Sequence, residues 1–175
     1  MDYEISLKNY NKKMKIAIIS DIHDNLANLG LFFEMIKTEE IKKIICCGDV
    51  CNQETLVFLS KNFKNEIFLV RVNMELYEDS EILKLENINY LGRYGTIEIG
   101  GFRVGVCHEP IFINNLLEND PELKFIFYGH THRPWISMRQ KATSINPGTL
   151  GGVFQKACFA IWDTETTDVK LKIIQ

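Results

Sequence analysis

Short apolar runs alternate with amphipathic segments along most of this chain. Residues 1–13 are polar, whereas the run KIAIIS at residues 15–20 is the first in which apolar side chains dominate. Two further runs of this kind, KKIICC at 42–47 and EIFLVRV at 66–72, follow at intervals. Continuous apolar runs of this length are typical of strands that are buried on both faces. The first half of the chain therefore predicts three buried strands.

Two segments with helical periodicity separate these strands. Apolar side chains recur on one side of residues 25–37, and Asn25 is well suited to cap the start of that helix. Residues 53–62 predict a second helix. The order strand–helix–strand–helix–strand indicates a parallel sheet with right-handed crossovers.

The second half of the chain consists mainly of predicted strands. Two alternating strands meet at Gly100-Gly101 and predict a hairpin over residues 96–107, followed by a helix at 112–119. Further strands are expected at residues 124–128, 135–139, 142–146, 157–162 and 169–174. We find no internal repeat or linker. We therefore expect a polar N-terminal extension at 1–13 and one α/β domain at 14–175, with two sheets packed together and helices outside.

Composition limits the classes of function. A net charge of −3 over 175 residues provides no general basic field, so nucleic acid is not an expected partner. No apolar run approaches the roughly 18 residues of a membrane span, and the polar N-terminus does not resemble a signal peptide. The five cysteines are odd in number and show no metal-binding spacing, which favours reduced thiols and a cytoplasmic location.

All four histidines lie in short motifs that also contain Asp, Asn or Gly. His23 lies in SDIHDN and His108 in VCHEP, while His130 and His132 share GHTH. Imidazole is a common ligand of transition metals, and carboxylate and amide oxygens complete mixed ligand shells. These motifs therefore indicate a metal site.

The candidate ligands also follow predicted strands, where the carboxyl ends of a sheet line its ligand crevice. They are Asp21 and His23 after the first strand, Asp49 after the second, Asn73 after the third, His108 after the hairpin, and His130 and His132 after the next strand. Each motif alone has a structural alternative: Asp49 in a turn, Asn73 as a helix cap, and His108 as a hydrogen-bonded residue near the core. Their shared position favours one metal site.

The ordered motifs SDIHDN, CGD, VNME, VCHE and YGHTH resemble those of the calcineurin-like metallophosphoesterases. The length of the chain and the later INPGT motif are similar to the small single-domain phosphodiesterase branch of that family. The resemblance extends over residues 14–175 and implies a four-layer αββα sandwich of two mixed β-sheets flanked by helices. It also implies two metal ions between the sheet edges.

Seven side chains match the metal ligands of this family. Those matched to the first metal ion are Asp21, His23 and His132, those matched to the second are Asn73, His108 and His130, and Asp49 would bridge the two. The resemblance implies two divalent transition metal ions, manganese first, with iron, zinc or nickel as alternatives. It further implies hydrolysis of a small phosphodiester or nucleotide-like substrate by in-line attack of a hydroxide that bridges the metals. Asp49, Asn73 and His108 would be the catalytic residues.

Val72, Met74 and Glu109 depart from the usual family pattern, whereas Glu75 lies where an acidic residue is common. Met74 occupies the position of a histidine that often follows the asparagine ligand, and it cannot protonate a leaving group. Glu75 is expected to orient a ligand imidazole from behind. Glu109 follows His108 and is expected to place a carboxylate where it repels phosphate.

Several alternatives stay open. Arg133 could hold a substrate phosphate or close the Pro134 turn through a salt bridge. The fold also resembles that of the small retromer subunit, a scaffold for protein partners with little or no catalysis. Trp135, Ile136 and Phe154 would then form a docking patch, unless they belong to the core. A homodimer is expected by analogy alone.

Overall fold

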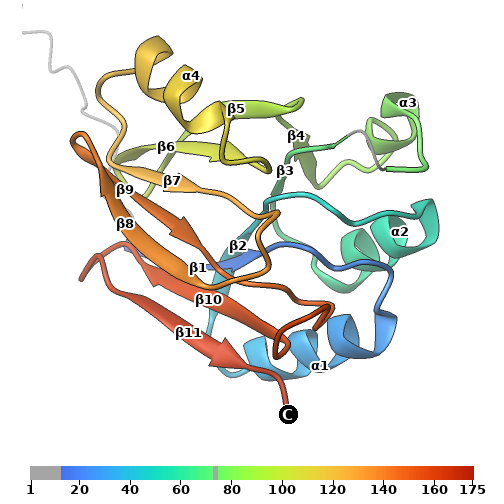
Figure 1. Ribbon diagram of the computed structural model, residues 1–175. Coiled ribbons are helices and arrows are strands. Elements are labelled where there is room, and N and C mark those ends of the chain that lie inside the picture. The colour runs from blue at the N-terminus through green and yellow to red at the C-terminus, as the bar shows by residue number, and fades with distance from the viewer. Residues whose placement is uncertain (1–12, 73–74) are drawn as a thin grey trace, which may run out of the picture.

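Residues 13–72 and 75–175 are described by the computed structural model, and they form two β-sheets with helices outside (Figure 1). The first sheet has the spatial order β11 (Val169–Ile173), β10 (Cys158–Asp163), β1 (Lys15–Ile19), β2 (Ile41–Cys46), β3 (Ile67–Leu69) and β4 (Ile88–Tyr90). The second has the order β5 (Tyr94–Ile99), β6 (Phe102–Cys107), β7 (Phe125–Phe127), β9 (Ala142–Asn146) and β8 (Trp135–Arg139). The helices are α1 (Leu26–Ile36), α2 (Gln53–Asn62), α3 (Asp79–Ile82) and α4 (Phe112–Asn119).

Both sheets are mixed. Strands β1 to β4 run parallel to one another, whereas β10 pairs antiparallel with β1 and β11 antiparallel with β10. In the second sheet, β6, β7 and β9 are parallel, and β5 and β8 are antiparallel strands at the two edges. The predicted combination of a parallel start with a later hairpin is therefore confirmed.

Three apolar interfaces separate four layers, as the predicted αββα sandwich requires. Along β1, Ile16 and Ile18 face the second sheet, whereas Ala17 and Ile19 face the side covered by α1 and α2. All four side chains are fully buried, which explains why this strand reads as a continuous apolar run. Burial of each isoleucine contributes roughly 1.5–3 kcal/mol. On the opposite side of the molecule, α4 packs against the outer face of the second sheet (Figure 1).

The predicted helices agree closely with the observed ones. The side chain of Asn25 accepts a hydrogen bond from the backbone N–H of Asn28 at 3.0 Å, so it caps α1 as expected. The helix α1 has 11 residues and is the longest in the described part of the chain. No helix there has the length and apolar character that a bilayer span requires.

The third strand is shorter than predicted, and two further elements follow it. The strand β3 ends at Leu69, because the backbone N–H of Arg71 bonds to the carbonyl of Gly92 at 2.9 Å and leaves the β2 ladder. The chain then forms α3 and β4, which have four and three residues. Elements this short carry no clear periodicity in the sequence.

The two sheets approach each other closely at Gly129, which follows β7. A Cβ atom at this position would lie 1.9 Å from Oγ of Ser20 and 2.9 Å from Oδ2 of Asp21, both of which follow β1. Only glycine fits at this distance. The loop after β7 can therefore lie directly against the loop after β1.

We predict that Gly129→Ala lowers the free energy of unfolding by roughly 1–3 kcal/mol, because the added methyl group displaces Ser20 and Asp21. Gly30→Ala is the matched control, since nothing lies within 4 Å of its Cβ position in α1. Alanine there should stabilise the helix by roughly 0.5–1 kcal/mol. Urea denaturation measures both variants. A shift of both unfolding midpoints in the same direction would contradict the proposed close approach.

Candidate metal centre

Backbone hydrogen bonds hold the loop after β1 against the loop after β2. The N–H groups of Ile22 and His23 both donate to the carbonyl of Asp49, at 2.8 and 3.0 Å. The N–H of Asp21 donates to the carbonyl of Gly48 at 3.0 Å. This pairing brings the side chains of Asp21, His23 and Asp49 to the same edge of the sheet.

Five of the candidate ligands have left-handed backbone conformations. Their φ angles are 54° at Asp21, 48° at His23, 54° at Asp49, 70° at His130 and 57° at His132. For residues other than glycine, such conformations cost on the order of 1 kcal/mol each and are concentrated at functional sites. The backbone at these strand ends is therefore strained, and this strain accompanies the convergence of the side chains.

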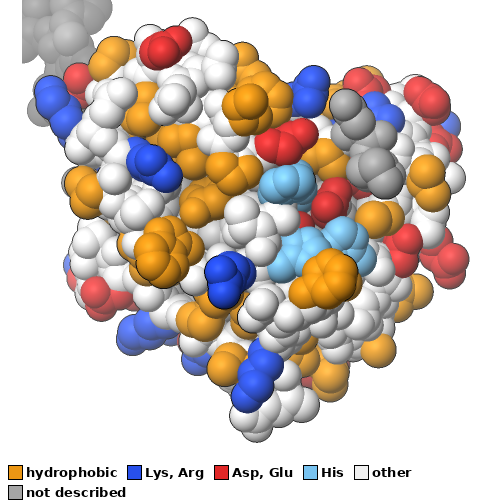
Figure 2. Space-filling model, viewed as in Figure 1, with side chains coloured by type: hydrophobic (Ala, Val, Ile, Leu, Met, Phe, Trp, Pro, Cys, Tyr) orange, Lys and Arg blue, Asp and Glu red, His pale blue; other side chains and the backbone are white. Residues whose placement is uncertain are grey.

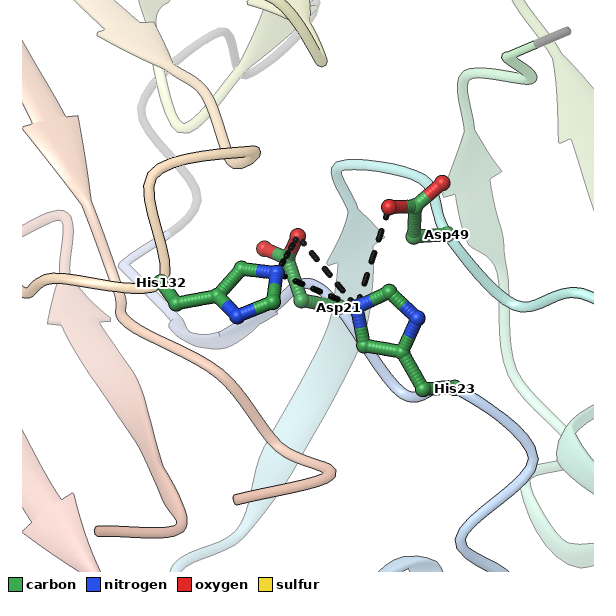
Figure 3. Close-up of side chains that lie close together, drawn as sticks. All are labelled: Asp21, His23, Asp49 and His132. Carbon is green, nitrogen blue, oxygen red and sulfur yellow. Dashed lines mark hydrogen bonds and ion pairs between the residues drawn. The ribbon is translucent and has the colours of Figure 1, made fainter. Parts of the chain in front are cut away.

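Four side chains form a compact cluster at this edge, drawn in Figure 3. One potential ligand atom from each of Asp21, His23, Asp49 and His132 lies within 4.8 Å of the other three. Nε2 of His132 lies 3.1 Å from Oδ1 of Asp21 and 3.1 Å from Nε2 of His23. Nε2 of His23 lies 3.9 Å from Oδ1 of Asp21 and 3.8 Å from Oδ2 of Asp49. The cluster combines two carboxylates with two imidazoles.

Two further histidines extend the cluster beyond Asp49. Nε2 of His108 lies 3.4 Å from Oδ2 of Asp49, the same oxygen that faces His23. The ring of His130 lies 5.3 Å from that of His108, and its backbone N–H donates to both oxygens of Asp21 at 3.2 Å. Asp49 therefore lies between two groups of histidines. The structure brings six of the seven predicted ligands together, and Asn73 lies outside the described residues.

Hydrogen bonds on the far side of two rings leave their Nε2 atoms available to a cation. Nδ1 of His108 lies 2.8 Å from the carbonyl oxygen of Cys47, and Nδ1 of His132 lies 3.1 Å from that of Val153. A carbonyl can only accept, so each Nδ1 carries the hydrogen, and in the neutral ring the lone pair is on Nε2. Oδ1 of Asp49 is buried and has no hydrogen-bond partner in the described part of the chain. These donor atoms fit a divalent transition metal ion.

The pKa values of these groups reflect the same crowding. Burial acts to raise the pKa of Asp49, but the hydrogen bond and positive charge of His108 outweigh it, so the pKa lies below its usual value. Burial likewise acts to lower the pKa of His108, and its interactions with Asp49 and Asp21 raise it overall. For Asp21 burial dominates, and its pKa is raised. Positive charge, whether from protons or a cation, is needed to keep these carboxylates ionised in a buried position.

Comparison with known proteins assigns the chain to a family. The family model described as the calcineurin-like phosphoesterase superfamily domain matches residues 14–167. The chain belongs to this superfamily. The resemblance inferred from the sequence motifs is thereby confirmed.

Individual relatives agree with this assignment. A phosphodiesterase from Methanocaldococcus jannaschii is 25% identical over 174 residues, which cover 93% of this chain and 100% of the relative. The solved structure of an archaeal phosphodiesterase has a TM-score of 0.81 at 23% identity and covers 91% of this chain and 99% of its own. Vps29 from Entamoeba histolytica, in a complex with zinc, has a TM-score of 0.64 at 16% identity, with 91% and 97% of the two chains covered. These two structures share the fold of this phosphoesterase.

Glu75 has different partners from those expected. Its Oε1 accepts a hydrogen bond from the backbone N–H of Val50 at 3.1 Å, and its Oε2 accepts one from that of Cys51 at 2.6 Å. The expected contact of Glu75 with a ligand imidazole is therefore not found among the described residues. Glu75 instead fixes the backbone immediately after Asp49. Its sequence position could not reveal this, because the bonds join loops about 25 residues apart.

The carboxylate of Glu109 is partly neutralised. Nη2 of Arg93 lies 3.5 Å from Oε1 of Glu109, and the guanidinium also lies over the ring of Phe112. The ion pair reduces the negative charge that Glu109 presents beside His108, and the expected repulsion of phosphate by this carboxylate stays a prediction. Arg93 lies in the turn between β4 and β5, and its ion pair with Glu109 could not be read from the sequence.

Arg133 is exposed, and its side chain makes no hydrogen bond or ion pair with any other described residue. The salt bridge at the Pro134 turn is therefore not found.

Asp24 joins the first loop to α2, a role that the sequence did not indicate. Its Oδ1 accepts hydrogen bonds from the backbone N–H of Asn52 at 2.9 Å and from the hydroxyl Oγ1 of Thr55 at 2.6 Å.

We predict that Glu75→Ala lowers the free energy of unfolding by roughly 2 kcal/mol or more, because the buried N–H of Val50 and the part-buried N–H of Cys51 lose their acceptor. Glu75→Gln keeps one acceptor oxygen and should lose less. Glu118→Ala, at an exposed position of α4, is the control. Thermal unfolding measures stability, and calorimetric titration with manganese reports whether the shifted Asp49 loop also weakens metal binding. Equal stability of the Glu75→Ala and Glu118→Ala variants would contradict this role.

Proposed function

We propose that this phosphoesterase is a phosphodiesterase that depends on two divalent transition metal ions. The observation that carries the proposal is the convergence of two carboxylates, Asp21 and Asp49, with four histidines that come from three of the four strand ends involved. Manganese is the first candidate, with iron, zinc or nickel as alternatives, because imidazole and carboxylate ligands suit these ions. The name of the Methanocaldococcus relative supports the choice of a diester.

The proposed ligands divide into two groups on either side of Asp49. The first ion would be held by Asp21, His23 and His132, the second by Asn73, His108 and His130, and Asp49 would bridge them. The position of Oδ2 of Asp49 between the Nε2 atoms of His23 and His108 supports this division. Support for Asn73 comes from the sequence motif.

In the proposed mechanism, each group of the site has a distinct role in hydrolysis. When bound, the two cations would acidify an attacking water and neutralise charge on the phosphoryl oxygens. Asp49 would keep its carboxylate ionised, and His108 would be held in position by its hydrogen bond to Cys47. Attack would proceed in line with the leaving oxygen. Met74 cannot protonate that oxygen, so we propose that water does so and that good leaving groups react fastest.

The proposed substrate is a small phosphodiester or a nucleotide-like molecule. The chain is short, and within residues 13–72 and 75–175 it follows the two-sheet core without a long inserted segment that could form a groove for a protein substrate.

The state of the cysteines supports a proposal about location. All five cysteines are unpaired, and four of them are buried. We therefore propose that the protein works in a reducing compartment, such as the cytoplasm.

A second candidate function is a scaffold for protein partners. Trp135, Ile136 and Met138 lie on β8, an edge strand of the second sheet, and are 63%, 56% and 66% exposed. The alternative that placed Trp135 and Ile136 in the core is therefore wrong. Exposed apolar side chains on an edge strand favour association with another protein, and the fold likeness to Vps29 is compatible with such a role. Tight binding of two metal ions together with turnover would favour the enzyme over the scaffold.

We predict that protein reloaded with manganese hydrolyses bis(p-nitrophenyl) phosphate and that Asp49→Asn lowers the rate at least about 100-fold, because a bridging carboxylate is lost. Asp168→Asn, an exposed position in the turn before β11, is the control and should retain the parent rate. Elemental analysis should show two metal ions per chain in the parent and fewer in Asp49→Asn. Equal rates in the parent and Asp49→Asn would refute the proposed mechanism.

We also predict that Arg93→Met raises KM for the same anionic diester roughly twofold to fivefold with little change in kcat. The variant leaves Glu109 without its counter-charge, and exposed ion pairs have effects of this size. The double variant Arg93→Met/Glu109→Gln removes both charges and should restore KM. Steady-state kinetics test the pair, and failure of the second substitution to restore KM would show that Arg93 acts independently of Glu109.

A further inference from the structure

Phe154 is the most exposed of the large hydrophobic side chains in the described part of the chain, with 90% of its surface accessible. It nevertheless lies beside the candidate metal centre. Its ring centroid is 6.0 Å from that of His132, and the two ring planes are inclined by only 22°. Figure 2 shows the histidine side chains gathered on one face of the molecule, with exposed hydrophobic side chains next to them.

The segment that carries Phe154 is fixed to the site loops. The backbone N–H of Gly151 donates to the carbonyl of Asp21 at 2.9 Å, and Nδ2 of Asn25 donates to the carbonyl of Gly151 at 2.9 Å. The carbonyl of Val153, which directly precedes Phe154, accepts the hydrogen bond from Nδ1 of His132 at 3.1 Å. The position of the phenyl ring is thus coupled to the proposed ligands.

The local conformation of Phe154 is unfavourable for the isolated chain. Its φ angle is +60°, a left-handed conformation that bulky side chains rarely adopt, and the ring gains almost no burial in return. Exposed aromatic rings held in a fixed orientation are suited to stacking on another flat ring, with little conformational entropy to lose. One face of the Phe154 ring lies toward His132, a proposed metal ligand, and the other face is open to solvent.

We propose that Phe154 is a stacking platform that gives this enzyme a preference for phosphate esters that carry an aromatic ring, such as a nucleobase. The proposal rests on the proposed function, because the phosphate group would be held at the metal centre while the ring lies on Phe154. Phe154 is then a specificity-determining residue that takes no part in the chemical step. This role differs from both alternatives that the sequence left open for Phe154, a protein-docking patch and the core.

Binding of two monophosphates to manganese-loaded protein tests this role by calorimetry. Adenosine 5′-monophosphate and ribose 5-phosphate share the phosphate and the sugar, but only the first has a base. The parent should bind adenosine 5′-monophosphate about tenfold more tightly, and Phe154→Ala should remove that difference while leaving the Kd of ribose 5-phosphate unchanged. Phe154→Trp should retain the preference. Leu171→Ala, an exposed apolar position on β11, is the control and should behave like the parent.

Three results would overturn the proposal. They are equal binding of the two ligands by the parent, an unchanged preference in Phe154→Ala, and equal weakening of both ligands in that variant. Hydrolysis of bis(p-nitrophenyl) phosphate, measured in parallel, reports on the proposed function separately. Loss of the preference in Phe154→Ala without turnover by the parent would support the platform and refute the phosphodiesterase activity.

Discussion

The close contact between the two sheets at their carboxyl edges is the constraint on which the rest of the structure depends. Gly129 has no side chain and donates its N–H to the carbonyl of His108, so the loops after β6 and β7 are joined. The next residue, His130, donates its N–H to the carboxylate of Asp21 across the interface between the sheets. Gly151 completes the connection through the carbonyl of Asp21. The site therefore exists only when both sheets are folded and packed.

This packing concentrates groups that repel one another without a cation. Two carboxylates lie within a few ångströms of His108 and His132, whose Nε2 lone pairs are directed inward in the neutral rings, and the backbone around them is strained. Hydrophobic burial on both faces of the first sheet, at side chains such as Ile18 and Ile19, offsets the unfavourable free energy of this crowded site. Binding of metal ions would return part of that cost, so folding and metal binding should be coupled.

Three groups of contacts surround the candidate metal ligands. Glu75 supports the loop that carries Asp49, and Arg93 offsets the charge of Glu109. Phe154 presents an aromatic surface beside His132. Glu75 would act through the position of Asp49, whereas Glu109 with Arg93, and Phe154, would act on the substrate.

The sequence by itself determined the strands, the main helices and the residues that make up the candidate site. Strands buried on both faces require continuous apolar runs, and the chemistry of metal ligands restricts the residue types that can follow them, so both leave local patterns. Only the tertiary structure decided the partners of Glu75 and Glu109, the short elements α3 and β4, and the exposure of Trp135 and Phe154. These features depend on contacts between segments far apart in the chain, and such contacts leave no periodic signal in the sequence.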